Sequence, residues 1–291
     1  MAKITIMRGL PASGKSTKAK LLLEHGNTVR INKDLLRTML HFDVFNYKKE
    51  EQTQDASRLL TEFYLTQGIN VIIDDTNLNP KVVAQYVEIA ERTKAKIEYV
   101  DTTDVSVDEC VSRDVLRSLQ QEKVRSVGGM VIKKMALQYM NYMAGENVVV
   151  CDLDGTLCNI EHRLKYGKGE EKNWKTFFEL IPGDSLRADV LEKLRETAKT
   201  TDSKIVLVSA RPEDHRFQTE LWLGKHGIQY DLLLMRQSND KRPDTEVKLE
   251  IYNKYLSKMK IWKVFDDRPS VIRMWRELGL LVEDVGAGIE F

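Results

Sequence analysis

The stretch ITIMRGLPASGKST, residues 4–17, decides the fold of the first half of this chain. Its first four residues have the β-branched and apolar character of a buried strand, and residues 18–24 after it have a helical pattern. Between them residues 9–17 satisfy the pattern G-x-x-x-x-G-K-[ST] in the strand-to-helix context that the motif requires. Glycines let successive N–H groups curl around an anion, and the helix N-terminus adds its positive dipole. The stretch predicts a phosphate-binding loop, with a plain Gly/Ser turn as the alternative.

Two side chains of this loop have specific expected roles. Lys15 would reach the β and γ phosphates of a nucleotide, and Ser16 would supply a hydroxyl for a Mg²⁺ ion that bridges the phosphates. The loop therefore predicts a bound nucleotide with Mg²⁺, but by itself it does not distinguish a kinase from a GTPase or a motor. The expected nucleotide-binding residues are Gly9, Ser13, Gly14, Lys15, Ser16 and Thr17.

The same alternation of short strands and longer helical segments continues along the chain. Strands are expected at residues 4–7, 28–31, 71–73 and 97–100, each separated by a helical stretch, which favours a parallel α/β sheet. The pattern stops near Gly145 and restarts with a fresh strand at 148–151, followed by strands at 205–208 and 261–265. We expect two α/β domains, residues 1–145 and 146–291.

Composition limits the class of protein. The chain has 291 residues, 42% of them hydrophobic and 31% charged, and a formal net charge of +1. A nearly neutral chain steers a polyanion only weakly, so any nucleic-acid site must be a local basic patch. Three cysteines without a CxxC spacing give no disulfide framework or zinc site, and no apolar run is long enough to cross a bilayer. We expect a cytoplasmic protein without a membrane partner.

The second predicted strand is followed by a candidate for the acceptor side of a kinase. Asp34 would open a helix at the carboxyl edge of the sheet, where ligands of open α/β folds bind, and its carboxylate could accept the proton of an attacking hydroxyl. Arg37, one turn later, could hold an acceptor phosphate. The alternative is that Asp34 is a plain N-cap or a partner of the helix N-terminal dipole, and Arg37 a solvated charge.

Polar residues also follow the third predicted strand, in the stretch DDTNLNP at residues 74–80. Either Asp74 or Asp75 could orient Mg²⁺ or the acceptor, Thr76 and Asn77 could contact substrate or cap a helix, and Asn79 suits a cap.

Two arginines further on, Arg113 and Arg117, share one helix face. One of them could stabilise charge on the transferring phosphoryl group, and the alternative is a solvated face on which Arg113 pairs with Asp108 or Glu109.

The second domain opens with VVVCDLDGTL at residues 148–157, a hydrophobic strand that delivers two alternate carboxylates into a glycine turn. Period-two geometry would put Asp152 and Asp154 on one side. Asp152 could attack phosphorus to form an acyl-phosphate, while Asp154 protonates the leaving oxygen and later activates water. Two carboxylates so close imply a Mg²⁺ ion.

Later residues of this half fit the same chemistry. Ser209 follows the strand at 205–208 and could hold a phosphoryl oxygen, Lys248 could neutralise a phosphoaspartate, and Asp266 with Asp267 could hold metal. Each has an ordinary alternative, because Asp-Gly is a common turn, Ser209 a possible cap, and Asp267-Arg268 a possible ion pair. Their appearance together in this order favours the catalytic interpretation.

With these residues in place, the chain resembles the bifunctional polynucleotide kinase and 3′-phosphatase of tailed bacteriophages, a P-loop kinase joined to a phosphatase of the haloacid dehalogenase superfamily. The resemblance covers nearly the whole chain. It rests on residues 9–17, 31–34 with Arg37, 75–80, 152–157, 209–211, 266–268 and 274–276. The string DTNLNP is its most specific part.

The resemblance implies further roles. Asp34 would be the general base for a 5′-hydroxyl and Arg117 the lid arginine that contacts ATP. The implied catalytic set is Asp34, Arg117, Asp152, Asp154, Lys15 and Lys248; the substrate-binding set is Arg37, Asp75, Thr76, Asn77, Arg163, Ser209, Arg211 and Asp244; the metal ligands are Ser16, Asp152, Asp154, Asp266 and Asp267. RNA and DNA ends would be the substrates, a polynucleotide ligase a functional partner, and a homotetramer the assembly.

Two departures from the family pattern matter. Ala12 stands where the family often has glycine, which is harmless if its φ is negative. The stretch 164–182, with Trp174, Phe177 and Phe178, does not match the family form, and its charged part at 165–175 is expected to be a surface loop.

The first functional hypothesis is an enzyme that transfers the ATP γ-phosphate to 5′-hydroxyl ends and removes 3′-phosphates. A second keeps both catalytic domains but assigns small molecules, as in a nucleoside kinase fused to a nucleotidase. A third is a non-catalytic ATP-dependent nucleic-acid-binding module. The presence of both Asp34 and Asp152 argues against the third, since a binder needs neither a base nor a nucleophile.

Overall fold

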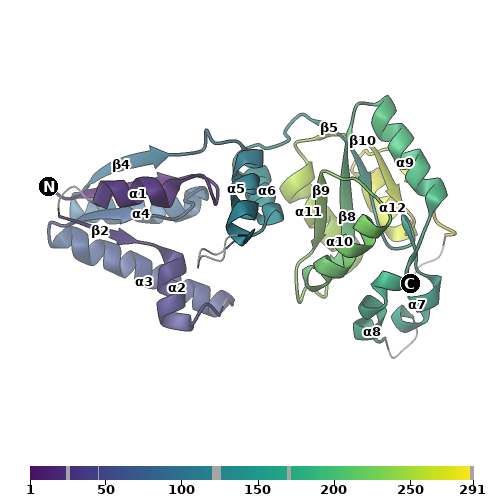
Figure 1. Ribbon diagram of the computed structural model, residues 1–291, viewed down its shortest axis with the longest axis horizontal. Coiled ribbons are helices and arrows are strands. Elements are labelled where there is room, and N and C mark those ends of the chain that lie inside the picture. Colours follow the sequence, from purple (N-terminus) through teal and green to yellow (C-terminus); the bar gives the residue numbers. More distant parts are fainter. Residues whose placement is uncertain (24–26, 45, 120–125, 169–171, 289–291) are drawn as a thin grey trace. The chain divides into compact units, whose positions relative to one another are not determined.

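The structure is a computed structural model that describes the chain except residues 24–26, 45, 120–125, 169–171 and 289–291. The chain divides into two compact units, Met1–Tyr142 and Met143–Phe291, each built on its own parallel sheet (Figure 1). The α/β fold class predicted from the alternation of strands and helices is therefore confirmed.

The first unit carries a four-stranded parallel sheet in the order β2-β3-β1-β4. All four predicted strands form, each within one residue of its expected ends. The predicted helix at 18–24 already begins at Lys15, and Glu24 lies outside the described residues. In chain order the elements are β1 (Lys3–Arg8), α1 (Lys15–Leu23), β2 (Thr28–Ile31), α2 (Lys33–His41), α3 (Tyr47–Thr66), β3 (Asn70–Ile73), α4 (Pro80–Thr93), β4 (Lys96–Asp101), α5 (Val107–Leu119) and α6 (Gly129–Tyr139).

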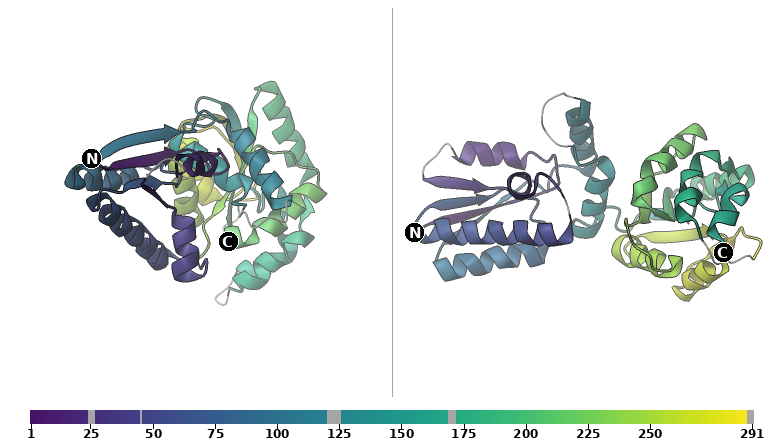
Figure 2. Two further views of the ribbon diagram at one scale, coloured as in Figure 1. Left: turned by 60° about the vertical axis from the view of Figure 1, so that its left-hand side comes forward. Right: turned by 90° about the horizontal axis from the view of Figure 1, so that it is seen from below.

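Alternation along the central strands builds a core on each face of this sheet. Ile4 and Ile6 of β1 pack with residues of α3 and α4, whereas Met7 packs with Ala19 of α1 and Ile72 of β3. Figure 2 shows α1 on one side of the sheet and α3 with α4 on the other. The phosphate-binding loop therefore leaves a strand that is covered on both faces, which fixes its position.

Helices α5 and α6 form a separate packed pair. Their core contains Cys110, Ile132 and Ala136 and also takes in Leu10 of the phosphate-binding loop. A Cβ on Gly129 would lie 2.9 Å from Val111 Cγ1, so the glycine lets the two helices approach closely. The pair is thus anchored directly to the loop.

The second unit carries a five-stranded parallel sheet in the order β11-β10-β5-β8-β9. The three strands predicted here form as β5, β8 and β10, and the sequence analysis did not anticipate β9 or β11. The elements are β5 (Asn147–Cys151), β6 (Cys158–Asn159), α7 (Glu161–Gly167), α8 (Trp174–Glu179), η1 (Ile181–Gly183), β7 (Ser185–Leu186), α9 (Ala188–Thr200), β8 (Lys204–Pro212), η2 (Glu213–His215), α10 (Arg216–Lys225), β9 (Leu232–Arg236), α11 (Asp244–Ile251), η3 (Tyr252–Leu256), β10 (Lys260–Asp266), α12 (Pro269–Glu277) and β11 (Val282–Asp284).

This sheet is also covered on both faces. In Figure 1 α9 and α10 lie in front of it and α11 and α12 behind it, and α11 packs against α12. Helices α7 and α8 pack against each other, inserted between β5 and α9. The expected surface loop at 165–175 is thus replaced at both ends by helix, and only residues 169–171 lie outside the described part. Among the described residues no helix is long and apolar enough to span a membrane.

Candidate active sites

The phosphate-binding loop packs against Thr102, the residue that directly follows the neighbouring strand β4. A Cβ on Gly9 would lie 2.1 Å from Thr102 Oγ1, and the φ of Gly9 is +145°, so this position accepts only glycine. Thr102 Oγ1 also lies 2.6 Å from Ser13 Oγ, and the Gly9 N–H donates to the Thr76 carbonyl at 3.0 Å. Hydrogen bonds therefore join the loop to the residues that follow β3 and β4, the two strands beside β1.

Lys15 is folded into this loop. Its ammonium donates to the Leu10 carbonyl at 2.5 Å and lies 3.4 Å from Ser13 Oγ. Burial lowers the pKa of Lys15 to about 8, although Asp74 opposes the shift, and the nearby Arg117 charge lowers it further. Lys15 and Arg117 therefore act on the same loop electrostatically, and an anion placed there would stabilise both cations.

Ala12 does not have the negative φ that would make it a neutral replacement for glycine. Its φ is +64°, in the left-handed region that an L-residue with a Cβ disfavours. The loop must turn at this residue to keep its N–H groups on the concave side, so the backbone adopts the conformation that glycine would take at lower cost.

Asp34 lies in the first turn of α2, but it is not the cap. Asn32 caps the helix by accepting from the Leu35 N–H at 3.0 Å. The Asp34 side chain is 70% exposed and lies 2.5 Å from Arg37, whose guanidinium also contacts Glu50 of α3 at 2.8 Å. The N-cap alternative for Asp34 is thus wrong, and the carboxylate remains open to an approaching hydroxyl.

The DDTNLNP stretch connects β2, α2 and β1 through side-chain contacts at the edge of the sheet. Asp74 pairs with Arg30 at 2.5 Å, and Asp75 accepts from the Lys33 N–H at 3.0 Å. Asn77 donates to the Met7 carbonyl at 2.7 Å.

Part of this stretch remains unsatisfied. The Asp75 side chain is 8% exposed, and burial raises its pKa. In the described part of the chain its Oδ2 has no hydrogen-bond partner, although the Lys33 ammonium lies 3.8 Å from it. That oxygen can still accept from a substrate donor. Asn79 caps α4, as expected.

The two candidate arginines of α5 differ in their surroundings. Arg113 pairs with Glu109 at 2.7 Å on an exposed helix face, as the ordinary alternative expects. The charge of Arg117 is the smallest of the influences on the pKa of Lys15 and lowers it. The role of Arg117 as a lid arginine stays a prediction.

The second site lies beyond the end of β5. The strand ends at Cys151, so Asp152 and Asp154 do not share a strand face as period-two geometry expected. Asp152 lies 2.8 Å from the Lys248 ammonium, which also contacts Asp266 at 2.8 Å. Burial raises the pKa of Asp152, Lys248 opposes the shift, and Asp266 and Asp267 add to it. Burial would lower the pKa of Lys248, but its two carboxylate partners outweigh burial and raise it.

Three buried carboxylates form a group that suits a divalent cation. Oxygens of Asp152, Asp266 and Asp267 lie within 4.8 Å of one another. Asp267 accepts from Thr156 at 2.9 Å, and burial together with Asp266 raises its pKa to about 6. Burial is the main cause of the raised pKa values of Asp152 and Asp267, and neighbouring carboxylates add to it, so a bound cation would lower both. The donor set is all oxygen, as Mg²⁺ prefers, so these residues fit the metal.

Asp154 lies outside this group, and its role as a metal ligand stays a prediction. Its carboxylate is bound by Arg211 at 2.6 Å and by Arg163. Burial alone would raise the pKa of Asp154, but the two guanidinium groups outweigh it and hold that pKa well below its usual range. Asp154 also belongs, with Cys158 and Asp184, to a second group of possible metal ligands, where the two arginines supply positive charge.

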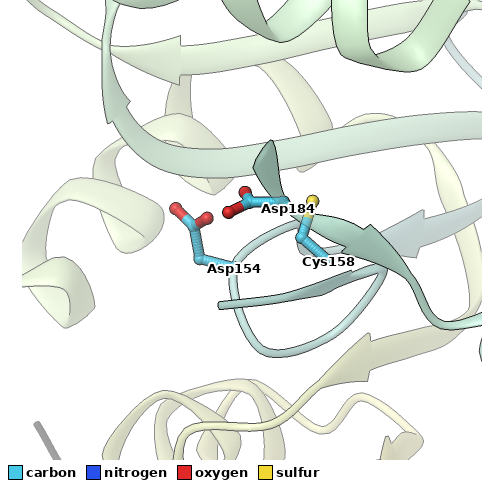
Figure 3. A group of neighbouring side chains, drawn as sticks. All are labelled: Asp154, Cys158 and Asp184. Carbon is cyan, nitrogen blue, oxygen red and sulfur yellow. The ribbon is translucent and has the colours of Figure 1, made fainter. Parts of the chain in front are cut away.

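Asp184, which the sequence analysis missed, completes a buried quartet with these groups. It binds Arg163 at 2.6 Å and Arg211 at 3.0 Å, and its carbonyl accepts from Trp222 Nε1 at 2.8 Å. Figure 3 shows the carboxylates of Asp154 and Asp184 turned toward each other, with Cys158 alongside. Because Asp184 lies 21 residues from Arg163 and 27 from Arg211, no local spacing marked it.

The remaining predicted residues surround the site. Ser209 is fully buried and its Oγ accepts from the Arg211 N–H at 3.2 Å. Asp244 begins α11, the helix that carries Lys248, and pairs with Arg236 and Arg268. Asp244 therefore fixes the first turn of α11 through these two ion pairs. Its carboxylate oxygens are bound by Arg236 and Arg268, and its predicted contact with substrate stays a prediction.

Comparison with known proteins separates the same two units. The family described as "AAA domain" matches residues 4–141, and the family described as "Polynucleotide kinase PNKP phosphatase domain" matches residues 146–289. The "Putative bifunctional polynucleotide kinase/RNA ligase" of Autographa californica nuclear polyhedrosis virus is 29% identical over 95% of this chain. The chain spans 41% of the length of that relative.

Two solved structures match along nearly the whole chain. A chain of the "Pnkp1/Rnl/Hen1 complex" is 31% identical, with 99% of this chain and 98% of that chain covered and a TM-score of 0.43. A chain of the "Pnkp1/Rnl/Hen1 RNA repair complex" is 29% identical, with 99% and 97% covered and a TM-score of 0.44. The two family models together cover both units, and the chain combines an AAA domain with a polynucleotide kinase phosphatase domain.

Proposed function

We propose that this protein heals broken nucleic-acid ends: it transfers the γ-phosphate of ATP to a 5′-hydroxyl of RNA or DNA and removes a 3′-terminal phosphate. The observation that carries the proposal is the buried Asp152, held 2.8 Å from Lys248 beside Asp266 and Asp267, on the same chain as a complete phosphate-binding loop. Both arrangements suit phosphoryl transfer: the first would add a phosphate to the nucleic-acid end, and the second would remove one.

In the kinase unit the protein positions charges around the phosphoryl group. Lys15 and the loop N–H groups would hold the ATP phosphates, with Ser16 as a ligand for Mg²⁺ and Arg117 placed for the transferring group. Asp34 would accept the proton of the 5′-hydroxyl as its oxygen bonds to phosphorus and ADP departs. Arg37, tied to Asp34 and Glu50, would bind the acceptor phosphate.

In the phosphatase unit the nucleophile belongs to the protein. Asp152 would form a bond to phosphorus while the bond to the 3′-oxygen breaks, and Lys248 would offset the charge of the acyl-phosphate. Asp154 would give a proton to the leaving oxygen. It would later take one from the water that bonds to phosphorus, as the bond from phosphorus to Asp152 breaks and inorganic phosphate leaves. We expect the incoming phosphate to compete for Arg163 and Arg211, which releases Asp154 for proton transfer. A bound Mg²⁺ on Asp152, Asp266 and Asp267 would neutralise the phosphoryl oxygens.

The proposal extends to partners. Ends with a 5′-phosphate and a 3′-hydroxyl are substrates for ligation, so a polynucleotide ligase is the expected functional partner. The relative named above is a putative kinase and RNA ligase in one chain, and both solved structures are complexes named with Rnl. A homotetramer remains a proposal from resemblance.

The proposal is tested with γ-labelled ATP, Mg²⁺ and an oligonucleotide that carries a 5′-hydroxyl and a 3′-phosphate. We expect label at the 5′ end and inorganic phosphate from the 3′ end. Both reactions should resist a large excess of free nucleoside and nucleoside 3′-phosphate. Faster turnover of those small molecules than of the oligonucleotide would instead establish a nucleoside kinase joined to a nucleotidase.

A further inference from the structure

The insert of α7 and α8 brings aromatic side chains onto the edge of the phosphatase site. Gly167, the last residue of α7, is buried under them: a Cβ there would lie 3.2 Å from Phe177 Cε2 and 3.5 Å from Trp174 Cζ3. The rings of α8 therefore rest directly on the α7 backbone. The insert is a packed pair of helices with a fixed aromatic face.

Phe177 connects this face to the catalytic groups. Its side chain is buried, and the Arg163 guanidinium carbon lies 4.3 Å from its ring centroid. The same Arg163 binds Asp154 and Asp184. The aromatic face of α8 is thus two side-chain contacts away from the proposed acid of the phosphatase reaction.

The other rings form a stack that ends at the surface. Trp174 stacks on Phe178 with centroids 6.0 Å apart and planes 22° apart, and Phe178 stacks on His215 at 4.9 Å and 28°. His215 lies four residues after Arg211, at the end of η2, which follows β8. Phe177 is buried and Phe178 is half-buried, whereas Trp174 is 43% exposed. A rigid indole left open beside a phosphoryl site suits a flat ligand.

We propose that Trp174 is the stacking platform for the nucleobase of the 3′-terminal nucleotide, an inference that rests on the proposed phosphatase function. Stacking on an aromatic ring accepts any base, because every base has a π face, as repair of arbitrary ends requires. The Lys172 ammonium lies 5.3 Å from the Trp174 ring. An exposed cation–π contact is weaker than base stacking, so a base displaces this ammonium and leaves it free to pair with a backbone phosphate.

The test uses the full-length chain and two oligonucleotides that end in a 3′-phosphate and differ only in whether the terminal nucleoside carries a base or is abasic. KM and kcat for phosphate release are measured for the wild type, Trp174→Ala, Trp174→Phe and Trp262→Ala. Trp262 is the matched control, because it is 52% exposed on β10 of the same unit. Labelling of the 5′ end by the same preparations reports intact protein.

For Trp174→Ala we expect KM for the base-bearing substrate to rise about 5- to 150-fold, with KM for the abasic substrate unchanged. Trp174→Phe should retain most of the affinity, and Trp262→Ala should match the wild type. An equal change on both substrates, or no change on either, overturns the platform while leaving the phosphatase function in place. Failure of the wild type to release phosphate from either oligonucleotide overturns both.

Discussion

The two proposed catalytic aspartates have opposite surroundings. Asp34 of the first unit has a side chain that is 70% exposed, whereas that of Asp152 in the second is 7% exposed and is held by a buried lysine. In a kinase the nucleophile arrives with the substrate, so its base must be reachable by a polymer end. In this phosphatase the nucleophile belongs to the protein, so burial can orient it and keep water from competing.

The charged side chains of the second site are buried, so each of them needs an oppositely charged partner. Asp154 and Asp184 face Arg163 and Arg211, while Lys248 contacts two further carboxylates. Charges removed from water are tolerated only when paired, and removal of one partner leaves an uncompensated buried charge. The exposed site can lose a charge without losing the fold, whereas the buried site couples chemistry to stability.

The largest expected effect separates the two aspartates as catalysts. Asp152→Ala should lower 3′-phosphate release about 10⁴-fold or more, because the nucleophile is lost, and leave 5′-labelling unchanged. Asp34→Ala should lower 5′-labelling by about 10²- to 10⁴-fold, the usual contribution of a general base, and leave phosphate release unchanged. Both are measured on one oligonucleotide by product mapping. Loss of both activities in either variant would contradict two independent sites.

The next effect tests the stability difference. Asp184→Asn should destabilise the second unit by roughly 3–5 kcal/mol, since Arg163 and Arg211 lose a buried counter-charge. Urea unfolding followed by tryptophan fluorescence reports this unit selectively, because Trp174, Trp222, Trp262 and Trp275 all lie in it.

The matched control for Asp184→Asn is Glu146→Gln, which breaks the exposed pair with Lys204 in the same unit. It should leave the unfolding curve where it is, because exposed pairs contribute little. Equal midpoints for Asp184→Asn and the wild type would mean that the quartet does not support the fold.

A smaller effect depends on pH at the first site. Lys15 has a pKa of about 8, and only its protonated form pairs with phosphate, so ATP binding takes up a proton above that pH. KM for ATP should be flat below pH 8 and rise up to about tenfold per pH unit above it. Steady-state kinetics at saturating oligonucleotide measures this. Lys15→Arg keeps its charge, so its KM should lack the rise, whatever its absolute value; a rise in both would assign the pH dependence to another group.

Local patterns predicted the parts that depend on neighbouring residues. The loop at 9–17, the strands that flank it and the string at 152–157 each carry their signal within a few residues, and the structure forms them. The interaction of Lys248 with Asp152 followed from charge type alone.

The missed features depend on contacts between distant residues. Asp184 follows a Pro-Gly turn with nothing local to distinguish it, and its role comes from arginines on α7 and β8. The strand β9 contains an apolar run from Leu232 to Met235, but the sequence analysis did not predict it. The contacts of Asp154 with Arg163 and Arg211 were also not predicted, because no sequence pattern shows that two buried guanidinium groups reach its carboxylate.

The smallest expected effect concerns strain in the first site. Ala12 at φ +64° pays about 1–2 kcal/mol for a left-handed conformation that glycine adopts freely. Glycine adds about 0.4–1 kcal/mol of unfolded-state entropy, so Ala12→Gly should stabilise the first unit by about 0.5–1 kcal/mol net. Hydrogen exchange of β1 and β3 amides isolates that unit. Ala84→Gly, in the exposed interior of α4, makes the same chemical change where φ is helical and should destabilise by about 1 kcal/mol. Opposite signs for one substitution at two positions of one unit would assign the difference to backbone conformation; equal signs would show that the loop relaxes and stores no strain.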